Sequence, residues 1–240
     1  MFRGFISEIK LDMLPDKKSY LHDLPVVQSL YSLGGIQFSS PVTVITGENG
    51  SGKSTLLEAV AIAAGFNPEG GSKHFNFQTV KAHSELHEYI KIIRRDYPKD
   101  GYFLRAESFF NVATNIDDVG VSAFYGGSLH ERSHGESFMD LVRNRLRGNG
   151  LYIFDEPDAA LSPQNVLALL CEIKALADLD SQFIIATHSP IIMAYPGADL
   201  LVLGENGFER KNYKDTEHFS VLKTFFDDPE RMLKMLGIQE

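Results

Sequence analysis

The sequence is poor in the features that mark secreted and membrane proteins. Its single cysteine, Cys171, excludes an intramolecular disulfide and fits a reducing cytoplasm. No stretch approaches the about 18 to 20 consecutive apolar residues that a membrane helix needs. The opening MFRGFISEIKL mixes charge into its apolar residues, unlike a secretory signal peptide. We therefore expect a cytoplasmic protein with no membrane segment of its own, in which Cys171 is a small core or boundary residue.

Positive charge is also scarce. The formal net charge is −9, which argues against tight, sequence-independent binding of nucleic acid over a broad face. Two basic clusters, one at Arg94-Arg95 and one at Arg143, Arg145 and Arg147, are interpreted as solvated faces of helices. Nucleic acid is therefore a possible partner that the net charge does not favour.

Strands and helices alternate along much of the 240 residues, of which 43% are apolar. Continuous apolar runs such as LYIFD and QFIIATH are typical of buried parallel strands. This alternation predicts an α/β fold with a mostly parallel sheet, covered by helices on both faces, in a single domain over 1–240. The expected elements are a first strand within 5–11, a strand at 42–46, a helix from 53 that ends at Gly65, a helix at 163–179, a hairpin turning at Asn206-Gly207, and C-terminal helices at about 216–226 and 229–236, within 212–240.

Residues 66–131 depart from this pattern and predict an insertion or arm that is partly helical. Within it, SELHEYIKIIRRDY at 84–97 has the spacing of an amphipathic helix, and YFLRAE at 102–107 that of a strand. The following segment, ESFMDLVRNRLR, predicts a helix with one buried face, formed by Phe138, Leu141, Val142 and Leu146.

The strongest chemical signal is GENGSGKS, which fits the P-loop pattern G-x-x-x-x-G-K-[ST] and stands between a β-branched strand and a helix. Its glycines let the backbone wrap closely around a phosphate, whose charge meets N–H groups at a helix N-terminus. Lys53 would reach the β- and γ-phosphates of ATP, and the Ser54 hydroxyl would be a ligand of Mg²⁺. The expected nucleotide-binding residues of this segment are Gly47, Glu48, Asn49, Gly50, Ser51, Gly52, Lys53, Ser54 and Thr55.

Two further strands end in residues suited to phosphate chemistry. LYIFDE places Asp155 at the carboxyl edge of the sheet as a ligand of Mg²⁺, and Glu156 beside it as a general base for the attacking water. FIIATHSP places His188 where it could bond the γ-phosphate or that water. The alternative for the acidic pair is an ordinary helix cap at the end of a strand. The alternative for His188 is a purely structural role. Because both strand ends occur in one chain with a P-loop, we favour the catalytic interpretation of Glu156, Lys53 and His188.

In this order, the P-loop, the DE pair as Walker B and a strand ending in His resemble the ABC-type ATPases. DEPDAALSP and THSP resemble segments of their soluble branch, which includes the SMC, RecF and overcoming-lysogenization-defect proteins. The whole chain is also similar to small stand-alone bacterial proteins described as predicted AAA-family ATPases. The resemblance implies a P-loop NTPase that binds and hydrolyses ATP with Mg²⁺.

The resemblance also gives a meaning to RSHGES, which lies where ABC-type ATPases carry a signature near LSGGQ. It implies that Ser133 and Gly135 contact the γ-phosphate held by the P-loop of an opposite subunit. Ser133 with Glu136 also forms a capping box, S-x-x-E, which needs no nucleotide, and both interpretations can hold together.

Two positions depart from the family pattern. Ser162 stands where transporter-type members have the D-loop Asp, which leaves it open whether Asp158 takes that role. Gln78 is the nearest candidate for the Q-loop glutamine and an additional Mg²⁺ ligand, although its spacing is short.

We therefore expect a homodimer that closes over two ATP·Mg²⁺ and drives or switches an unidentified protein partner in DNA maintenance or defence. The chain has no long heptad run, no zinc-hook Cys-x-x-Cys and no recognisable nuclease segment after His188.

One alternative is the ATP-binding subunit of a membrane transporter, which THSP and the missing D-loop Asp disfavour. Another is a nucleotide-dependent binding switch with little turnover, which Glu156 disfavours because a switch needs no base. P-loop kinases and GTPases would leave His188 without a role.

Overall fold

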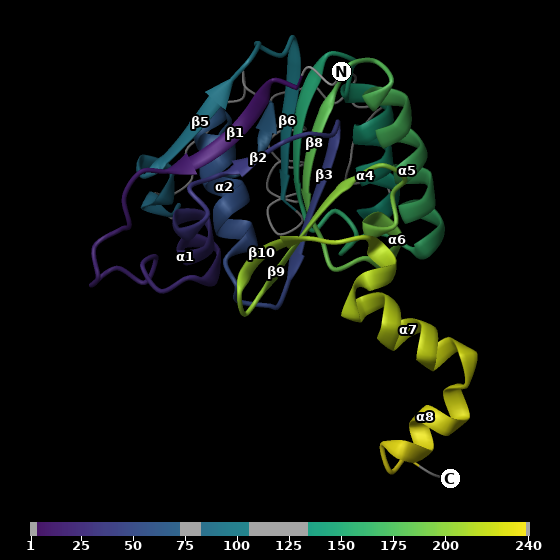
Figure 1. Cartoon of the computed structure of the whole chain (residues 1–240). Coiled ribbons are helices and arrows are strands. Elements are labelled where there is room, and N and C mark those ends of the chain that lie inside the picture. The colour runs from purple at the N-terminus through teal and green to yellow at the C-terminus, as the bar shows by residue number, and fades with distance from the viewer. Residues whose placement is uncertain (1–3, 73–82, 106–133, 239–240) are drawn as a thin grey trace.

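The computed structural model describes residues 4–72, 83–105 and 134–238, which form two β-sheets and the helices around them (Figure 1). The larger sheet has the strand order β10-β9-β3-β8-β7-β6-β4, and its central pairs, from β9 to β6, are parallel. An antiparallel strand closes each edge. The strands of this sheet are β3 (Val42–Gly47), β4 (Gly71–Ser72), β6 (Asp100–Arg105), β7 (Gly150–Asp155), β8 (Gln182–Ala186), β9 (Asp199–Gly204) and β10 (Gly207–Arg210).

Helices cover both faces of this sheet, as predicted. On one face lie α1 (Pro25–Ser32) and α2 (Lys53–Ala64), and on the other lie α4 (His134–Arg145), α5 (Pro163–Ala177) and α6 (Pro190–Met193) (Figure 1). The apolar face expected for this segment is confirmed, because its four predicted core residues, three in α4 and Leu146 directly after it, are at most 3% exposed. The α/β fold with a mostly parallel sheet is therefore confirmed.

The smaller sheet is antiparallel, with the order β2-β1-β5, and packs on the outer side of α2 (Figure 1). Its strands are β1 (Ile6–Leu11), β2 (Ile36–Gln37) and β5 (Ile90–Arg94). The side chain of Gln182, fully buried in β8, ties the two sheets together. Its amide accepts from the N–H of Ile6 and donates to the carbonyl of Ile6, each at 2.9 Å.

The helix predicted at 84–97 is wrong. The chain forms a short 3₁₀ helix, η1 (Glu85–Glu88), followed by β5. Along β5, inward-facing Ile90 and Ile92 alternate with exposed Lys91 and Ile93, which is the period of a strand. Three β-branched residues favour this pleated arrangement, and pairing with β1 stabilises it. In the described part of 66–131, β4, β5 and β6 therefore belong to the two sheets.

Cys171 also departs from its prediction, since it is exposed and not part of the core. The buried residues of α5 are Val166, Leu169, Ile173 and Leu176. Residue 171 lies two positions from Leu169, nearly half a turn of the helix away, so its side chain faces outward.

The C-terminal segment forms α7 (Glu217–Asp227) and α8 (Pro229–Met235), in agreement with the two helices predicted there. Asp228 caps α8 by accepting the N–H of Arg231 at 3.0 Å, with Pro229 at the first helical position. Both helices extend away from the sheets (Figure 1), and neither contains a buried residue. No helix in the described ranges is long and apolar enough to cross a membrane.

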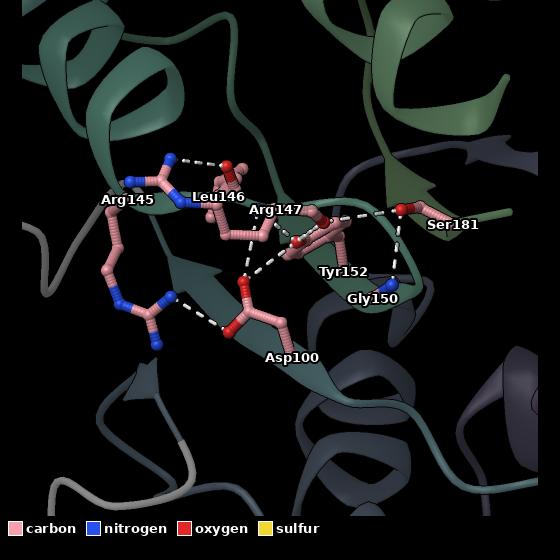
Figure 2. Close-up of polar contacts among 7 residues, drawn as sticks. All are labelled: Asp100, Arg145, Leu146, Arg147, Gly150, Tyr152 and Ser181. Atoms are coloured by element: carbon pink, nitrogen blue, oxygen red, sulfur yellow. Dashed lines mark hydrogen bonds and ion pairs between the residues drawn. The ribbon is translucent and has the colours of Figure 1, made fainter. Parts of the chain in front are cut away.

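A polar network fixes the end of α4 against the first residues of β6 and β7 (Figure 2). Tyr152 is fully buried, and its single O–H lies within donor reach of both Asp100 and the carbonyl of Arg147, while its oxygen accepts the N–H of Arg147 at 2.7 Å. Asp100 also pairs with Arg145 at 2.8 Å. Burial raises the pKa of Tyr152, with the carboxylate of Asp100 adding to the effect, so the hydroxyl stays protonated and can donate.

We expect Tyr152→Phe to lower the free energy of unfolding by about 0.5–1.5 kcal/mol, because Arg147 and Asp100 each lose a hydrogen bond to the hydroxyl while keeping their other partners. The ring itself would keep its packing. Urea denaturation measures the change, and Tyr20→Phe, at a residue 65% exposed, is the matched control. Equal unfolding midpoints for both variants and the unsubstituted protein would show that this network does not contribute to stability as expected.

Candidate nucleotide-binding site

Strand register brings the predicted motifs together at one edge of the sheet. β8 lies between β3 and β7, and its residue Ala186 pairs with Ile45 on one side and with Asp155 on the other. Since neighbouring strands are about 4.8 Å apart, the P-loop that follows β3 and the acidic pair that ends β7 leave the sheet about 10 Å from each other. His188 follows Ala186 by two residues, between them. Ligands of open α/β sheets bind at such carboxyl edges.

The P-loop needs two of its glycines to pack closely against α1 and β9. Gly52 has φ +92°, in the left-handed region, and a Cβ there would lie 2.7 Å from the Val26 side chain. A Cβ on Gly47 would lie 2.6 Å from the carbonyl oxygen of Leu203. The N–H of Val26 also donates to Ser51 at 3.1 Å, so α1 supports the loop from outside. Sequence analysis did not identify α1, although Pro25 at a first helical position was a usable signal.

The rest of the loop lies as a phosphate cradle requires. Lys53 is 5% exposed, and its ammonium donates to the carbonyls of Gly47 at 2.9 Å and Glu48 at 2.7 Å. Burial lowers the pKa of Lys53, while the nearby carboxylates of Glu156 and Asp155 oppose that shift. The remaining predicted residues are either exposed at the tip of the loop or at least partly buried near the start of α2: Glu48, Asn49 and Gly50 in the first group, Ser51, Ser54 and Thr55 in the second.

The two predicted Mg²⁺ ligands meet across the site. The hydroxyl of Ser54 donates to Asp155 Oδ1 at 3.0 Å, and Asp155 is 6% exposed. A hydroxyl and a carboxylate side by side are the hard oxygen donors that Mg²⁺ prefers, and the phosphates of a nucleotide supply the others. The residues present therefore fit an ATP·Mg²⁺ complex. Gln78, the third candidate ligand, lies outside the described residues.

An ion pair between a half-buried arginine and a buried glutamate borders these two predicted ligands, and sequence analysis missed it. Arg105, at the end of β6, is paired in register with Asp155 and donates to Glu58 Oε2 at 2.6 Å. Its Nε lies 3.9 Å from Asp155 Oδ2. Glu58, from α2, also accepts the N–H of Ser84 at 2.8 Å. Charged residues at a strand end and inside an apolar helix were the signal, but their pairing depends on the tertiary structure.

Glu156 leaves β7 with an uncommon backbone conformation. Its φ is +51°, in the left-handed region that non-glycine residues rarely adopt, and its N–H donates to Ala186 at 2.9 Å. Its carboxylate acts electrostatically on both Lys53 and His188. The backbone therefore holds this carboxylate beside the P-loop, where a general base for water would be needed.

His188 is placed as a sensor of a ligand would be. Its Nε2 is buried and has no hydrogen-bond partner among the residues that the structure describes. Burial lowers the pKa of His188, and the positive charge of Lys53 adds to this effect, so the neutral imidazole is favoured. A buried ring nitrogen without a partner among the described residues calls for an explanation, and a ligand in the adjoining site provides one.

The two D-loop candidates have structural contacts. Asp158 accepts the hydroxyl of Thr187, which also accepts the N–H of Ser189 at 2.8 Å. Ser162 caps α5 by accepting the N–H of Asn165 at 3.3 Å. Asp158 thus joins the Walker B segment to the His188 segment, whereas Ser162 begins a helix.

The predicted signature is described only in part. Ser133 lies outside the described residues, whereas Gly135 is buried in the first turn of α4. A Cβ on Gly135 would lie 3.1 Å from the carbonyl oxygen of Ala160. The start of α4 therefore packs closely on the segment that follows the acidic pair.

Comparisons with known proteins agree with this geometry. A family model described as "AAA domain" matches residues 29–136. A second, described as "AAA domain, putative AbiEii toxin, Type IV TA system", matches residues 129–194. Between them, the two matches span the P-loop, the acidic pair and His188.

Individual relatives are distant. A protein of Haemophilus influenzae named "Uncharacterized ABC transporter ATP-binding protein" is 24% identical over 204 residues, which are 75% of this chain and 77% of that protein. The structure of cbiO1 from Clostridium perfringens, described as part of the ABC transporter complex cbiONQ, aligns with a TM-score of 0.51 at 18% identity, over 98% of this chain and 100% of that one. The SMC head domain from Thermotoga maritima aligns with a TM-score of 0.46 at 16% identity, over 86% of this chain and 99% of that one.

The cbiO1 likeness concerns the fold, and the two AAA-domain matches concern the sequence that carries the motifs. Together with the order of P-loop, acidic pair and histidine at one sheet edge, they agree with a P-loop NTPase fold and with the resemblance to ABC-type ATPases.

Proposed function

We propose that the protein binds ATP with Mg²⁺ and hydrolyses it while two copies of the chain are closed face to face in the cytoplasm. A partner protein would use the resulting motion in DNA maintenance or defence. The observation that carries the proposal is the contact between Ser54 and Asp155 at 3.0 Å beside the buried ammonium of Lys53. Strand β7 and helix α2 otherwise have no need to bring such groups together.

Each residue has a role that follows from its position. Lys53 would place its charge on the β- and γ-phosphates, exchanging its bonds to loop carbonyls for bonds to phosphate oxygens. Glu156 would orient the attacking water and accept its proton, and His188 would bond the γ-phosphate or that water through its buried Nε2. Bound Mg²⁺ supplies positive charge to the phosphate oxygens. Catalysis of phosphoryl transfer depends mainly on such positioning and charge.

Two features support a second copy as part of the site. Ser133 and Gly135 resemble the signature that reaches a nucleotide on an opposite subunit. In the described structure, Gly135 packs on the segment after Glu156, so closely that a Cβ at this position would lie 3.1 Å from the carbonyl oxygen of Ala160. A nucleotide bound against the start of α4 would therefore act on the same segment that carries the proposed base.

A second candidate is the ATP-binding subunit of a membrane transporter. The names of the Haemophilus influenzae relative and of the Clostridium perfringens structure favour it. Affinity purification from membranes solubilised in detergent tests it. Stable recovery of one integral membrane protein with the chain would support the transporter over a partner in DNA maintenance or defence.

We expect Lys53→Ala to weaken ATP·Mg²⁺ binding by about ten- to a hundredfold, because a charge-assisted hydrogen bond contributes about 1.5–3 kcal/mol. Isothermal titration calorimetry measures the affinity. Lys174→Ala removes a lysine from an exposed position on α5 and is the matched control. An unchanged affinity in Lys53→Ala would contradict the assignment of the P-loop as the nucleotide site.

We expect Glu156→Gln to reduce ATP hydrolysis by about a hundredfold or more, since general base catalysis contributes about 10²–10⁴. Binding of ATP should persist, because the amide keeps the size of the carboxylate. Release of phosphate measures turnover. Turnover equal to that of the unsubstituted protein would rule out Glu156 as the base.

The Glu156→Gln protein also tests the two-chain arrangement. We expect its solution mass to double with ATP·Mg²⁺, and to remain that of a monomer when Ser133→Arg is added, since the larger cation would block the signature. Light scattering measures both masses. If ATP binds and the mass stays monomeric without Ser133→Arg, the homodimer is wrong, and RSHGES is left with its helix-capping role.

A further inference from the structure

The C-terminal helices touch the candidate site at one residue. The ring of His218, in the first turn of α7, lies with its centroid 6.3 Å from that of His188, tilted by 43°. This separation is within the range of interacting aromatic rings. His218 also acts electrostatically on His188. Sequence analysis gave no role to His218.

The contact is built into the fold, because the first turn of α7 is anchored. Thr216 is 4% exposed, donates to the carbonyl of Tyr213 at 2.7 Å and caps α7 by accepting the N–H of Phe219 at 3.2 Å. Tyr213 packs on the core beneath α5 and α6 and meets the ring of Phe219 edge-on at 5.2 Å. The position of His218 is therefore set from both sides.

Beyond its first turn, the C-terminal segment is not anchored in the core. α7 and α8 contain no buried residue, and they project from the body of the protein (Figure 1). Their large apolar side chains include several that are mostly exposed: Phe226 at 71%, Met235 at 78% and Leu236 at 66%. A small change at the first turn would consequently be passed on to the direction of the whole helix pair.

Hydrogen bonds fix the backbone on both sides of His188. Its neighbours Thr187 and Ser189 are bonded to Ile45 and to each other, while its Nε2 has no hydrogen-bond partner in the described ranges. The ring of His218 is a described neighbour that can restrict how the imidazole of His188 turns.

We propose that His218 positions the imidazole of His188 and thereby couples the occupancy of the nucleotide site to α7 and α8. The inference rests on the proposed function, since it takes ATP as the ligand that His188 meets. ATP and ADP differ in the γ-phosphate that His188 would contact, so only ATP would change the His188–His218 contact. Coupling between two sites is reciprocal. A nucleotide that shifts α7 must therefore be bound with an affinity that depends on His218.

Reciprocity gives two independent measurements on the full chain, both in the Glu156→Gln protein so that ATP persists. The first is hydrogen exchange of the amides of 217–227 with ATP·Mg²⁺ and with ADP·Mg²⁺. The second is the ratio of the ATP to the ADP affinity, which a general loss of stability would not change. The variants are His218→Ala, His218→Gln in case the first does not fold, and Lys223→Ala as an exposed control on the same helix.

We expect ATP to change the exchange of α7 amides relative to ADP in the Glu156→Gln protein and in the Lys223→Ala control. In His218→Ala, that difference should disappear, and the affinity ratio should change by about fivefold or more, the size of a typical coupling. If His218→Ala keeps both the exchange difference and the affinity ratio, the coupling is wrong while the proposed function stands. If the Glu156→Gln protein binds neither nucleotide, the proposed function fails, and the coupling fails with it.

Discussion

The placement of β8 between β3 and β7 is the constraint on which the site depends. In-register pairing of Ala186 with Ile45 and Asp155 sets the distance between the P-loop and the acidic pair, and it fixes where His188 leaves the sheet. The same strand begins with Gln182, whose buried amide holds β1 of the smaller sheet. A shift of one residue in β8 would therefore misalign the motifs, exchange its side chains between the two cores and break the link between the sheets.

Around this frame, each buried charged group in the part of the chain that the structure describes has a partner. Lys53 bonds to loop carbonyls, Asp155 meets the hydroxyl of Ser54, and Glu58 pairs with Arg105. Unpaired burial of any of these charges would be costly. The imidazole of His188, which lies next to the first turn of α7, differs from these charged groups because its buried Nε2 has no partner within the described residues. The arrangement leaves the imidazole available to a ligand.

Much of the site could be predicted because its signals are local. The P-loop glycines, the apolar run before Asp155 and the run before His188 each carry their meaning within a few residues, and buried parallel strands are recognisable as continuous apolar runs. The helix prediction for 84–97 is wrong because Leu86 and Ile90 have a helical spacing, whereas the partner of Ile90 is Leu11, far away in the sequence. The Glu58–Arg105 pair and the His188–His218 contact could not be predicted, since each joins elements that only the tertiary structure brings together.

The central claim is that Ser54 and Asp155 form one Mg²⁺-dependent nucleotide site with the P-loop. Thermal unfolding in the presence of ATP tests it most directly, comparing Mg²⁺ with EDTA in the unsubstituted protein and in Asp155→Asn. At ATP about a hundredfold above its dissociation constant, binding stabilises the protein by about 2.7 kcal/mol, which corresponds to a rise in Tm of about 5–10 °C. We expect this rise only with Mg²⁺ and only with Asp155 in place. An equal rise in EDTA or in Asp155→Asn, or no rise at all, would contradict it.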